Sequence, residues 1–78
     1  MDILHKVPNP PFPVEIVDTK SVEVANPYSG EKVMLEPLAV AVYDCIKGAE
    51  MLEDYDTVEK GIEWFQKHYP KEYMVLLD

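Results

Sequence analysis

The stretch PLAVAVYDCIKGAEML, residues 37–52, decides the fold of this chain. Pro37 suits the first turn of a helix, where its missing amide hydrogen would have no partner in any case. Gly48 weakens a helix, and we expect it to mark a close packing contact. Apolar residues recur at steps of three and four, which places them along one side of a helix: Leu38, Ala41, Val42, Cys45, Ala49 and Leu52. This spacing predicts an amphipathic helix with one buried stripe.

A second helix is predicted to follow directly. Asp56-Thr57-Val58-Glu59 has the pattern of a capping box, with Asp56 as N-cap and Glu59 at the third helical position. Gly61 would let another backbone approach this helix. The helix ends before Pro70, because a residue that precedes proline avoids the helical region. Its apolar stripe consists of Val58, Ile62, Phe65 and Tyr69.

The segment after Pro70 allows two interpretations. A short last helix that opens with Pro70 is one, and a final strand over residues 73–77 is the other. Eight residues are too few for the apolar period to decide between them.

A β-hairpin precedes the helices. Val22 and Val24 alternate with a glutamate, the period-two pattern of a half-buried strand, and Val33 and Leu35 return on the same face. The turn between them is Asn26-Pro27-Tyr28-Ser29-Gly30, which combines an Asn that bonds the backbone ahead, a Pro that presets φ and a Gly that accepts positive φ. Residues 14–17 show the same alternation and are predicted to form a third strand.

These elements predict one α+β domain over residues 14–78: a small two- or three-stranded antiparallel β-meander packed against two main α-helices and a short C-terminal helix. Residues 1–13 hold four prolines and are predicted to form an extended arm. Two P-x-x-P frames in the arm could dock in an aromatic groove of another protein. Alternatively, the arm lies along its own domain with Phe12 packed against it.

The charge of the chain excludes several classes of partner. Its 78 residues include 15 Asp and Glu against 7 Lys and no Arg, for a net charge of −8. Such a chain is repelled by nucleic-acid backbones and anionic lipid surfaces, so we expect neither direct nucleic-acid binding nor membrane binding. The longest apolar run, residues 38–43, is too short to span a bilayer. The N-terminus lacks a signal-peptide pattern, which predicts a cytoplasmic protein.

No residue pattern predicts catalysis, a cofactor or a metal ion. The single cysteine, Cys45, pairs with His5 or His68 in no known catalytic spacing, and a buried free cysteine behaves as a small hydrophobe. Asp54, Asp56 and Glu59 lack the further ligands of a calcium loop. Phosphate loops, serine elbows and zinc motifs are missing from the sequence. We therefore expect a protein without enzymatic activity.

Two surfaces are candidates for binding other proteins. Residues 44–63 carry a net charge of −5, and their carboxylates could imitate nucleic-acid phosphates or simply be solvated. The predicted acidic surface consists of Asp44, Glu50, Glu53, Asp54 and Asp56. The predicted protein interface consists of Trp64, His68 and Tyr73, with Trp64 as a partly exposed anchor. In the alternative interpretation, the C-terminal segment folds back and covers Trp64 with Tyr73 and Leu76.

Residues 24–78 carry a resemblance. Tyr43-Asp44, Lys60-Gly61-Ile62-Glu63-Trp64-Phe65 and the ending Pro70-Lys71-Glu72-Tyr73-Met74-Val75-Leu76-Leu77-Asp78 resemble small uncharacterised proteins of tailed bacteriophages, marine phages included. The resemblance implies a setting, the cytoplasm of an infected bacterium, and a role in host takeover or as an accessory of the particle. It implies no functional residues.

Together these observations predict a small acidic protein that acts by binding a host or phage protein, or a second copy of itself. The alternative is an acidic nucleic-acid mimic that blocks a basic nucleic-acid-binding protein, which would make it a host-protein inhibitor.

Overall fold

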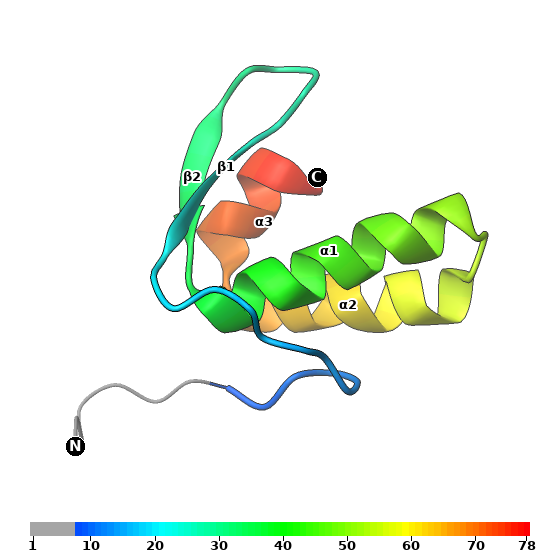
Figure 1. Ribbon diagram of the computed structural model, residues 1–78. Coiled ribbons are helices and arrows are strands. Elements are labelled where there is room, and N and C mark those ends of the chain that lie inside the picture. The colour runs from blue at the N-terminus through cyan, green and yellow to red at the C-terminus, as the bar shows by residue number, and fades with distance from the viewer. Residues whose placement is uncertain (1–7) are drawn as a thin grey trace.

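The computed structural model describes residues 8–78 and contains two antiparallel strands and three helices: β1 (Val22–Ala25), β2 (Lys32–Leu35), α1 (Pro37–Met51), α2 (Tyr55–His68) and α3 (Pro70–Leu76). The predicted α+β fold class is confirmed. Helices α1 and α2 lie side by side as an antiparallel pair, and α3 packs between α2 and the hairpin (Figure 1). Strand β2 contacts both α1 and α3 and so joins the sheet to the helices.

Helix α1 is the centre of the core. Pro37 occupies its first turn, as predicted, and Glu36 precedes it in an extended conformation. Every residue from Leu38 to Tyr43 is buried, so the first half of α1 is covered all round rather than along one stripe. The largest fully buried side chains are Phe65, Leu35, Ile46 and Val42, which come from α2, β2 and α1.

Two predictions for the end of α1 are wrong. Gly48 is exposed, and a Cβ built on it meets no atom within 4 Å, so it marks no packing contact. Leu52 lies beyond the helix and is 82% exposed. Helix α1 ends at Met51, so Leu52 lies beyond the part of α1 that packs against α2 and stays exposed.

The turn from α1 to α2 differs from the predicted capping box. Asp54, not Asp56, is the N-cap: its carboxylate accepts hydrogen bonds from the Thr57 backbone N–H (3.3 Å) and from the Thr57 hydroxyl (2.6 Å). Asp56 already lies in the first turn of α2. Glu53 has a φ of 57°, the left-handed conformation that closes α1 and is usually taken by glycine.

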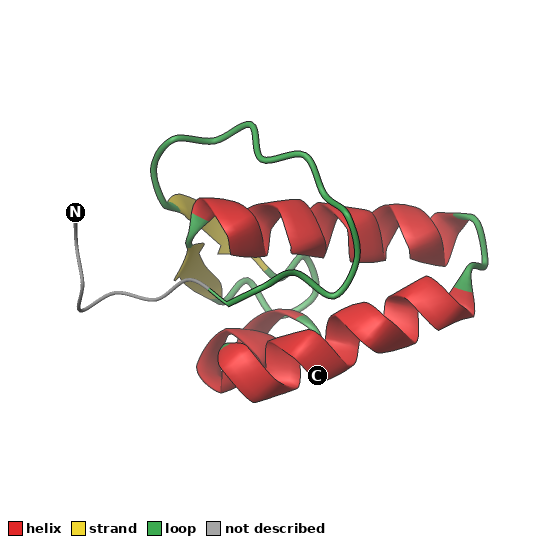
Figure 2. Cartoon of the chain, turned by 90° about the horizontal axis from the view of Figure 1, so that it is seen from below, coloured by secondary structure: helices red, strands yellow, loops and turns green. Residues whose placement is uncertain are grey.

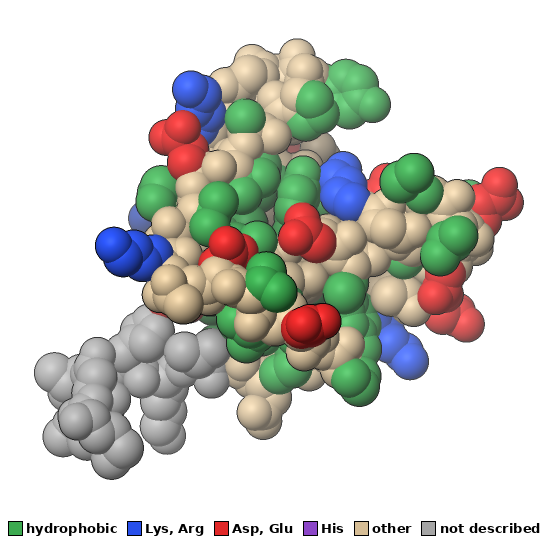
Figure 3. Space-filling model, viewed as in Figure 1, with side chains coloured by type: hydrophobic (Ala, Val, Ile, Leu, Met, Phe, Trp, Pro, Cys, Tyr) green, Lys and Arg blue, Asp and Glu red, His purple; other side chains and the backbone are tan. Residues whose placement is uncertain are grey.

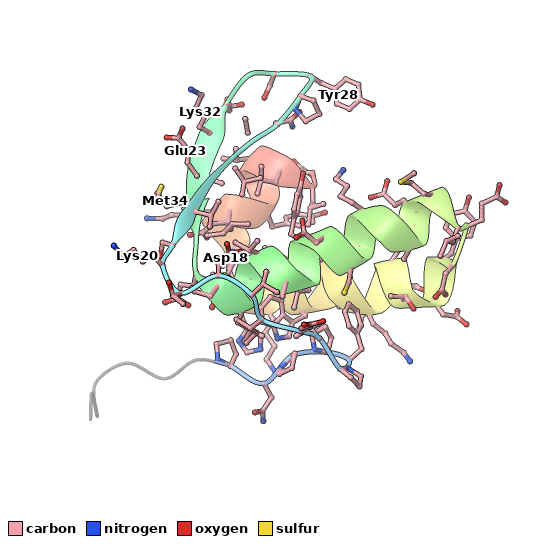
Figure 4. All side chains as sticks on the ribbon, viewed as in Figure 1. Asp18, Lys20, Glu23, Tyr28, Lys32 and Met34 are labelled. Atoms are coloured by element: carbon pink, nitrogen blue, oxygen red, sulfur yellow. The ribbon has the colours of Figure 1, made fainter. Side chains whose placement is uncertain are left out.

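The hairpin follows the predicted register, with Val22 opposite Leu35 and Val24 opposite Val33 on the inner face. Glu23, Lys32 and Met34 point away from the helices (Figure 4), and Lys32 pairs with Glu23 at 3.8 Å. In the turn, Gly30 has the expected positive φ of 79°. The Asn26 side chain accepts hydrogen bonds from the Tyr28 N–H at 2.8 Å and the Ser29 N–H at 3.3 Å.

The predicted third strand does not form: within residues 8–78 only β1 and β2 pair, and residues 14–17 lie outside any ladder. The segment before the hairpin runs beside the helical pair instead of beside β1, and the chain bends at Thr19 and Lys20 before it enters β1 (Figure 1). Val14 packs against the core, while Ile16 and Val17 are 52% and 74% exposed.

The last segment is helical, so the alternative of a strand over residues 73–77 is wrong. Tyr69 separates α2 from α3 with a φ of −137° and a ψ of 61°, outside the helical region that a residue before proline avoids. Leu76 is buried at 4% exposure. The Asn26 side-chain N–H donates to the Val75 carbonyl at 2.8 Å and ties the hairpin turn to α3.

The described part of the proline-rich arm, residues 8–13, crosses the helical pair on the side away from the hairpin tip (Figure 2). Phe12 is half-buried and packs against the core, in agreement with the interpretation in which the arm lies along its own domain. Gly61 is closely approached, as predicted, but by a side chain rather than a backbone: a Cβ there would lie 2.4 Å from Ile46 Cγ1.

Candidate functional site

Trp64, the predicted anchor of a protein interface, belongs to the core. It is 6% exposed, and its indole N–H donates to the Asn9 carbonyl at 2.5 Å. The prediction of a partly exposed Trp64 is therefore wrong. The N-terminal arm accepts the indole hydrogen bond through its backbone. The alternative interpretation expects the C-terminal segment to cover Trp64 instead.

An aromatic cluster surrounds Trp64. Its ring lies 5.2 Å from the rings of Phe65 and Tyr69 and 5.6 Å from that of His68. His68 lies in the last turn of α2, as predicted, and is exposed, while Tyr73 is half-buried. Of the three predicted interface residues, only His68 is thus freely accessible.

A partly buried hydrogen bond joins this cluster to the start of α1. The Tyr69 hydroxyl donates to the Glu36 carboxylate at 2.5 Å, which links the end of α2 to the residue that precedes α1. Burial and the neighbouring Glu36 carboxylate raise the pKa of the Tyr69 phenol. Tyr69 therefore stays protonated over the physiological pH range and keeps this hydrogen bond, so its role is structural.

The five residues of the predicted acidic surface are all exposed: Asp44, Glu50, Glu53, Asp54 and Asp56. All but Asp44 gather at the end of the helical pair where α1 passes into α2, and acidic side chains show at that end of the molecule (Figure 3). Two of them are engaged locally. Glu50 lies 3.7 Å from Lys47, and the hydrogen bonds from Thr57 hold the pKa of the Asp54 carboxyl below its usual value.

The candidate residues for catalysis and metal binding are not brought together. Cys45 is a half-buried free thiol that lines one hollow with Phe12 and Gly48, whereas His68 lines a different one with Trp64. His5 lies outside the described residues. Among residues 8–78, no group of three His, Cys, Asp or Glu side chains is arranged to hold a metal ion.

The structure shows one surface that the sequence did not reveal. A groove of about 350 Å³ opens between the hairpin turn, α1, α2 and the end of α3. We call it the tyrosine groove, because Tyr28 and Tyr55 lie on it and are 96% and 63% exposed. Figure 4 shows Tyr28 at the tip of the hairpin, and Figure 3 shows the surface hollowed beneath that tip. The lining residues are Asn26, Pro27, Tyr28, Lys47, Glu50, Tyr55, Val58, Ile62, Leu76, Leu77 and Asp78.

No protein-family model, curated protein or solved structure matches this chain. The resemblance to small phage proteins therefore stays a prediction. Of the described helices, none has the length and apolarity needed to cross a bilayer.

Only one signal in the sequence pointed to the tyrosine groove. Tyr28 stands in a turn of otherwise polar and turn-forming residues, where an aromatic side chain has no neighbour along the chain to cover it. That the turn lies against the end of α3 depends on the Asn26–Val75 hydrogen bond, which joins residues 49 positions apart. Local patterns contain no information about such a contact.

Proposed function

We propose that this chain is a non-enzymatic binding module that docks on another protein through the tyrosine groove. The observation that carries the proposal is the exposure of two aromatic side chains on one hollow, Tyr28 from the hairpin turn and Tyr55 from the start of α2. Tyrosines of this kind dominate the binding energy of protein interfaces, because they bury a large apolar area and keep a polar tip.

The end of α1 carries exposed apolar side chains close to Tyr55 in the sequence. Met51, the last residue of α1, is 86% exposed and precedes Tyr55 by four positions. Leu52 is 82% exposed but lines a separate hollow with Phe12 and Cys45, so it does not extend the tyrosine groove.

The charge around the groove selects the partner. Among the described residues that line it, the one cation is Lys47, which is paired with Glu50 and lies 5.6 Å over the Tyr43 ring, and Asp78 adds a further carboxylate. The chain as a whole carries −8. We therefore propose a partner segment with apolar anchors and flanking Lys or Arg residues, on a host or phage protein in the bacterial cytoplasm.

The experiment is affinity capture from infected cells with the full chain as bait, followed by calorimetric titration of the captured protein. Tyr28→Ala combined with Tyr55→Ala should weaken binding at least tenfold, while circular dichroism stays unchanged. The matched control is Met34→Ala, because Met34 is 54% exposed on the outer face of the hairpin, outside the groove. Equal affinity of the double variant and the wild type would refute the proposal.

The acidic mimic is the second candidate, favoured by the exposure of all five predicted carboxylates and the gathering of four of them at one end of the helical pair. Reversing Asp44, Glu53 and Asp56 to lysine tests it, since these three line no part of the tyrosine groove and Asp56 is not the cap of α2. A mimic should lose its partner in this variant and in high salt. Binding through the groove should be weakened much less by either change, because its apolar anchors are not screened.

A further inference from the structure

The N-terminal arm occupies a groove of its own on the helical pair. We call it the arm groove and define it by Ile46, Gly61 and Trp64. Asn9 accepts the indole hydrogen bond of Trp64, and Phe12 lies above Gly61, with its Cε2 3.6 Å from the place a Cβ would take. That Cβ would overlap Ile46, so glycine at position 61 lets α1 and α2 pack closely at the place that Phe12 covers.

The linker that connects the arm to β1 is held by packing, with Val14 against the core. Within the described part of the chain, residues 14–20 make no hydrogen bond, and Ile16 and Val17 are 52% and 74% exposed. Their sequence nevertheless has the alternation of a strand, which the monomer leaves without a partner. The eight residues 14–21 can span up to about 28 Å when extended, so the arm has the reach to leave its own molecule.

The surface around the arm groove suits the approach of a second copy. Residues 8–14 of the arm carry no charge. Beside Pro11 lie Lys60, Lys67 and His68, with Glu63 as the one acid among the described lining residues, so this hollow is less acidic than the tyrosine groove, where Lys47 lies with Glu50 and Asp78. Two molecules of charge −8 meet here with less repulsion than at the tyrosine groove.

We propose that the arm groove binds residues 8–13 of a second copy of this chain, giving a two-fold dimer in which the arms are exchanged. Each groove keeps the contacts seen in the monomer, because the exchanged segment is identical. The dimer adds one interface that the monomer lacks: the two linkers run antiparallel beside each other and cover Ile16 and Val17. The unpaired strand pattern of residues 14–17 then has its partner. This inference concerns a different surface from the tyrosine groove and does not depend on it.

The test is cross-linking between two full-length variants, each also carrying Cys45→Ser. Pro11 and Lys67 line the same hollow, so Pro11→Cys is mixed with Lys67→Cys and oxidised at about 0.1 mM. The control mixture pairs Pro11→Cys with Met34→Cys, since Met34 lies on the outer face of the hairpin. Exchange predicts that a disulfide-linked pair of unlike chains predominates in the first mixture and not in the control. Equal yields in both mixtures would overturn the proposal.

Light scattering on two further variants gives an independent readout. Ile16→Asp combined with Val17→Asp places charges in the interface that the exchanged dimer adds, so dimer should form only at higher concentration than in the wild type. Phe12→Ala removes the anchor of the arm and should remain monomeric with unchanged helical circular dichroism. A variant with aspartate at positions 16 and 17 that dimerises like the wild type, or a Phe12→Ala variant that does so, would contradict arm exchange.

Discussion

The two grooves on either side of the helical pair both contain aromatic side chains and differ in what covers them. In the arm groove, Trp64 is covered by the chain itself and is hydrogen-bonded to Asn9. In the tyrosine groove, Tyr28 and Tyr55 face water. An aromatic residue therefore becomes core or candidate binding surface according to whether a segment of the same chain reaches it, and not according to its type or helical position.

The difference also separates the two kinds of partner proposed for this protein. The arm groove has an occupant of known sequence, so its natural partner is another copy of that sequence. The tyrosine groove has no occupant among residues 8–78, and the carboxylates on its rim point to a basic segment of another protein. Variants in the arm groove should therefore lower the stability of the fold, whereas variants in the tyrosine groove should lower binding of the other protein.

Trp64→Ala should produce the largest effect. Removing the ring empties the arm groove and leaves the Asn9 carbonyl without its donor, which lowers the free energy of unfolding by about 3–5 kcal/mol. A domain of this size rarely has more than ~3–5 kcal/mol in total, so the variant should be largely unfolded. Tyr28→Ala, in the open groove, should change stability by less than about 0.5 kcal/mol. Urea unfolding followed by circular dichroism measures both, and a folded Trp64→Ala variant would show that Trp64 is not core.

The glycines of the two helices form the next comparison. Gly61→Ala places a Cβ 2.4 Å from Ile46 Cγ1 and should destabilise the protein by about 1–3 kcal/mol. Gly48→Ala meets open space and should stabilise α1 by up to about 1 kcal/mol. Thermal unfolding checks the pair. Two shifts of the same sign would contradict the different surroundings of these positions.

Much of this fold could be predicted from local chemistry. Pro37 and Pro70 mark helix starts, Gly30 accepts the positive φ of the turn, and the alternation of Val22 and Val24 selects the inner face of the hairpin. Each of these features depends on a residue's own backbone or on neighbours a few positions away. Such information is contained in the sequence itself.

The features that sequence reasoning missed depend on segments far apart in the chain. The stripe on α1 widens to a fully buried Leu38–Tyr43 because the sheet, α2 and the arm all meet there. Residues 14–17 have the alternating pattern of a strand but pair with no other strand. The predicted N-cap of α2, Asp56, lies two residues after the observed one, Asp54, for a different reason. Both aspartates precede a plausible first turn, and the hydrogen bonds from Thr57 select Asp54.

Asn26 controls the wall of the tyrosine groove, and its variants should sharpen the comparison further. Asn26→Ala loses the turn bonds to Tyr28 and Ser29 together with the bond to Val75, at a cost of about 1–2 kcal/mol. Asn26→Asp keeps the acceptor oxygen for the turn and loses only the donor to Val75. We expect Asn26→Asp to weaken partner binding while unfolding at a urea concentration between those of Asn26→Ala and the wild type. Identical unfolding of the two variants would show that the Val75 bond supplies the whole effect.

The smallest effect is expected at the turn that joins the two grooves. Asp54 caps α2 through Thr57, so Asp54→Ala should lower the midpoint of thermal unfolding at neutral pH, and Asp56→Ala should lower it less. Because the folded-state pKa of the Asp54 carboxyl lies below its usual value of 3.8, the carboxylate form is the one that stabilises the fold. Its contribution is complete above the unfolded pKa and is lost as the pH falls through the lowered folded-state pKa. The difference in midpoint between the wild type and Asp54→Ala should therefore shrink below about pH 4 and stay constant above it. A difference that persists unchanged to pH 2 would mean that the side chain acts through packing and not through its charge.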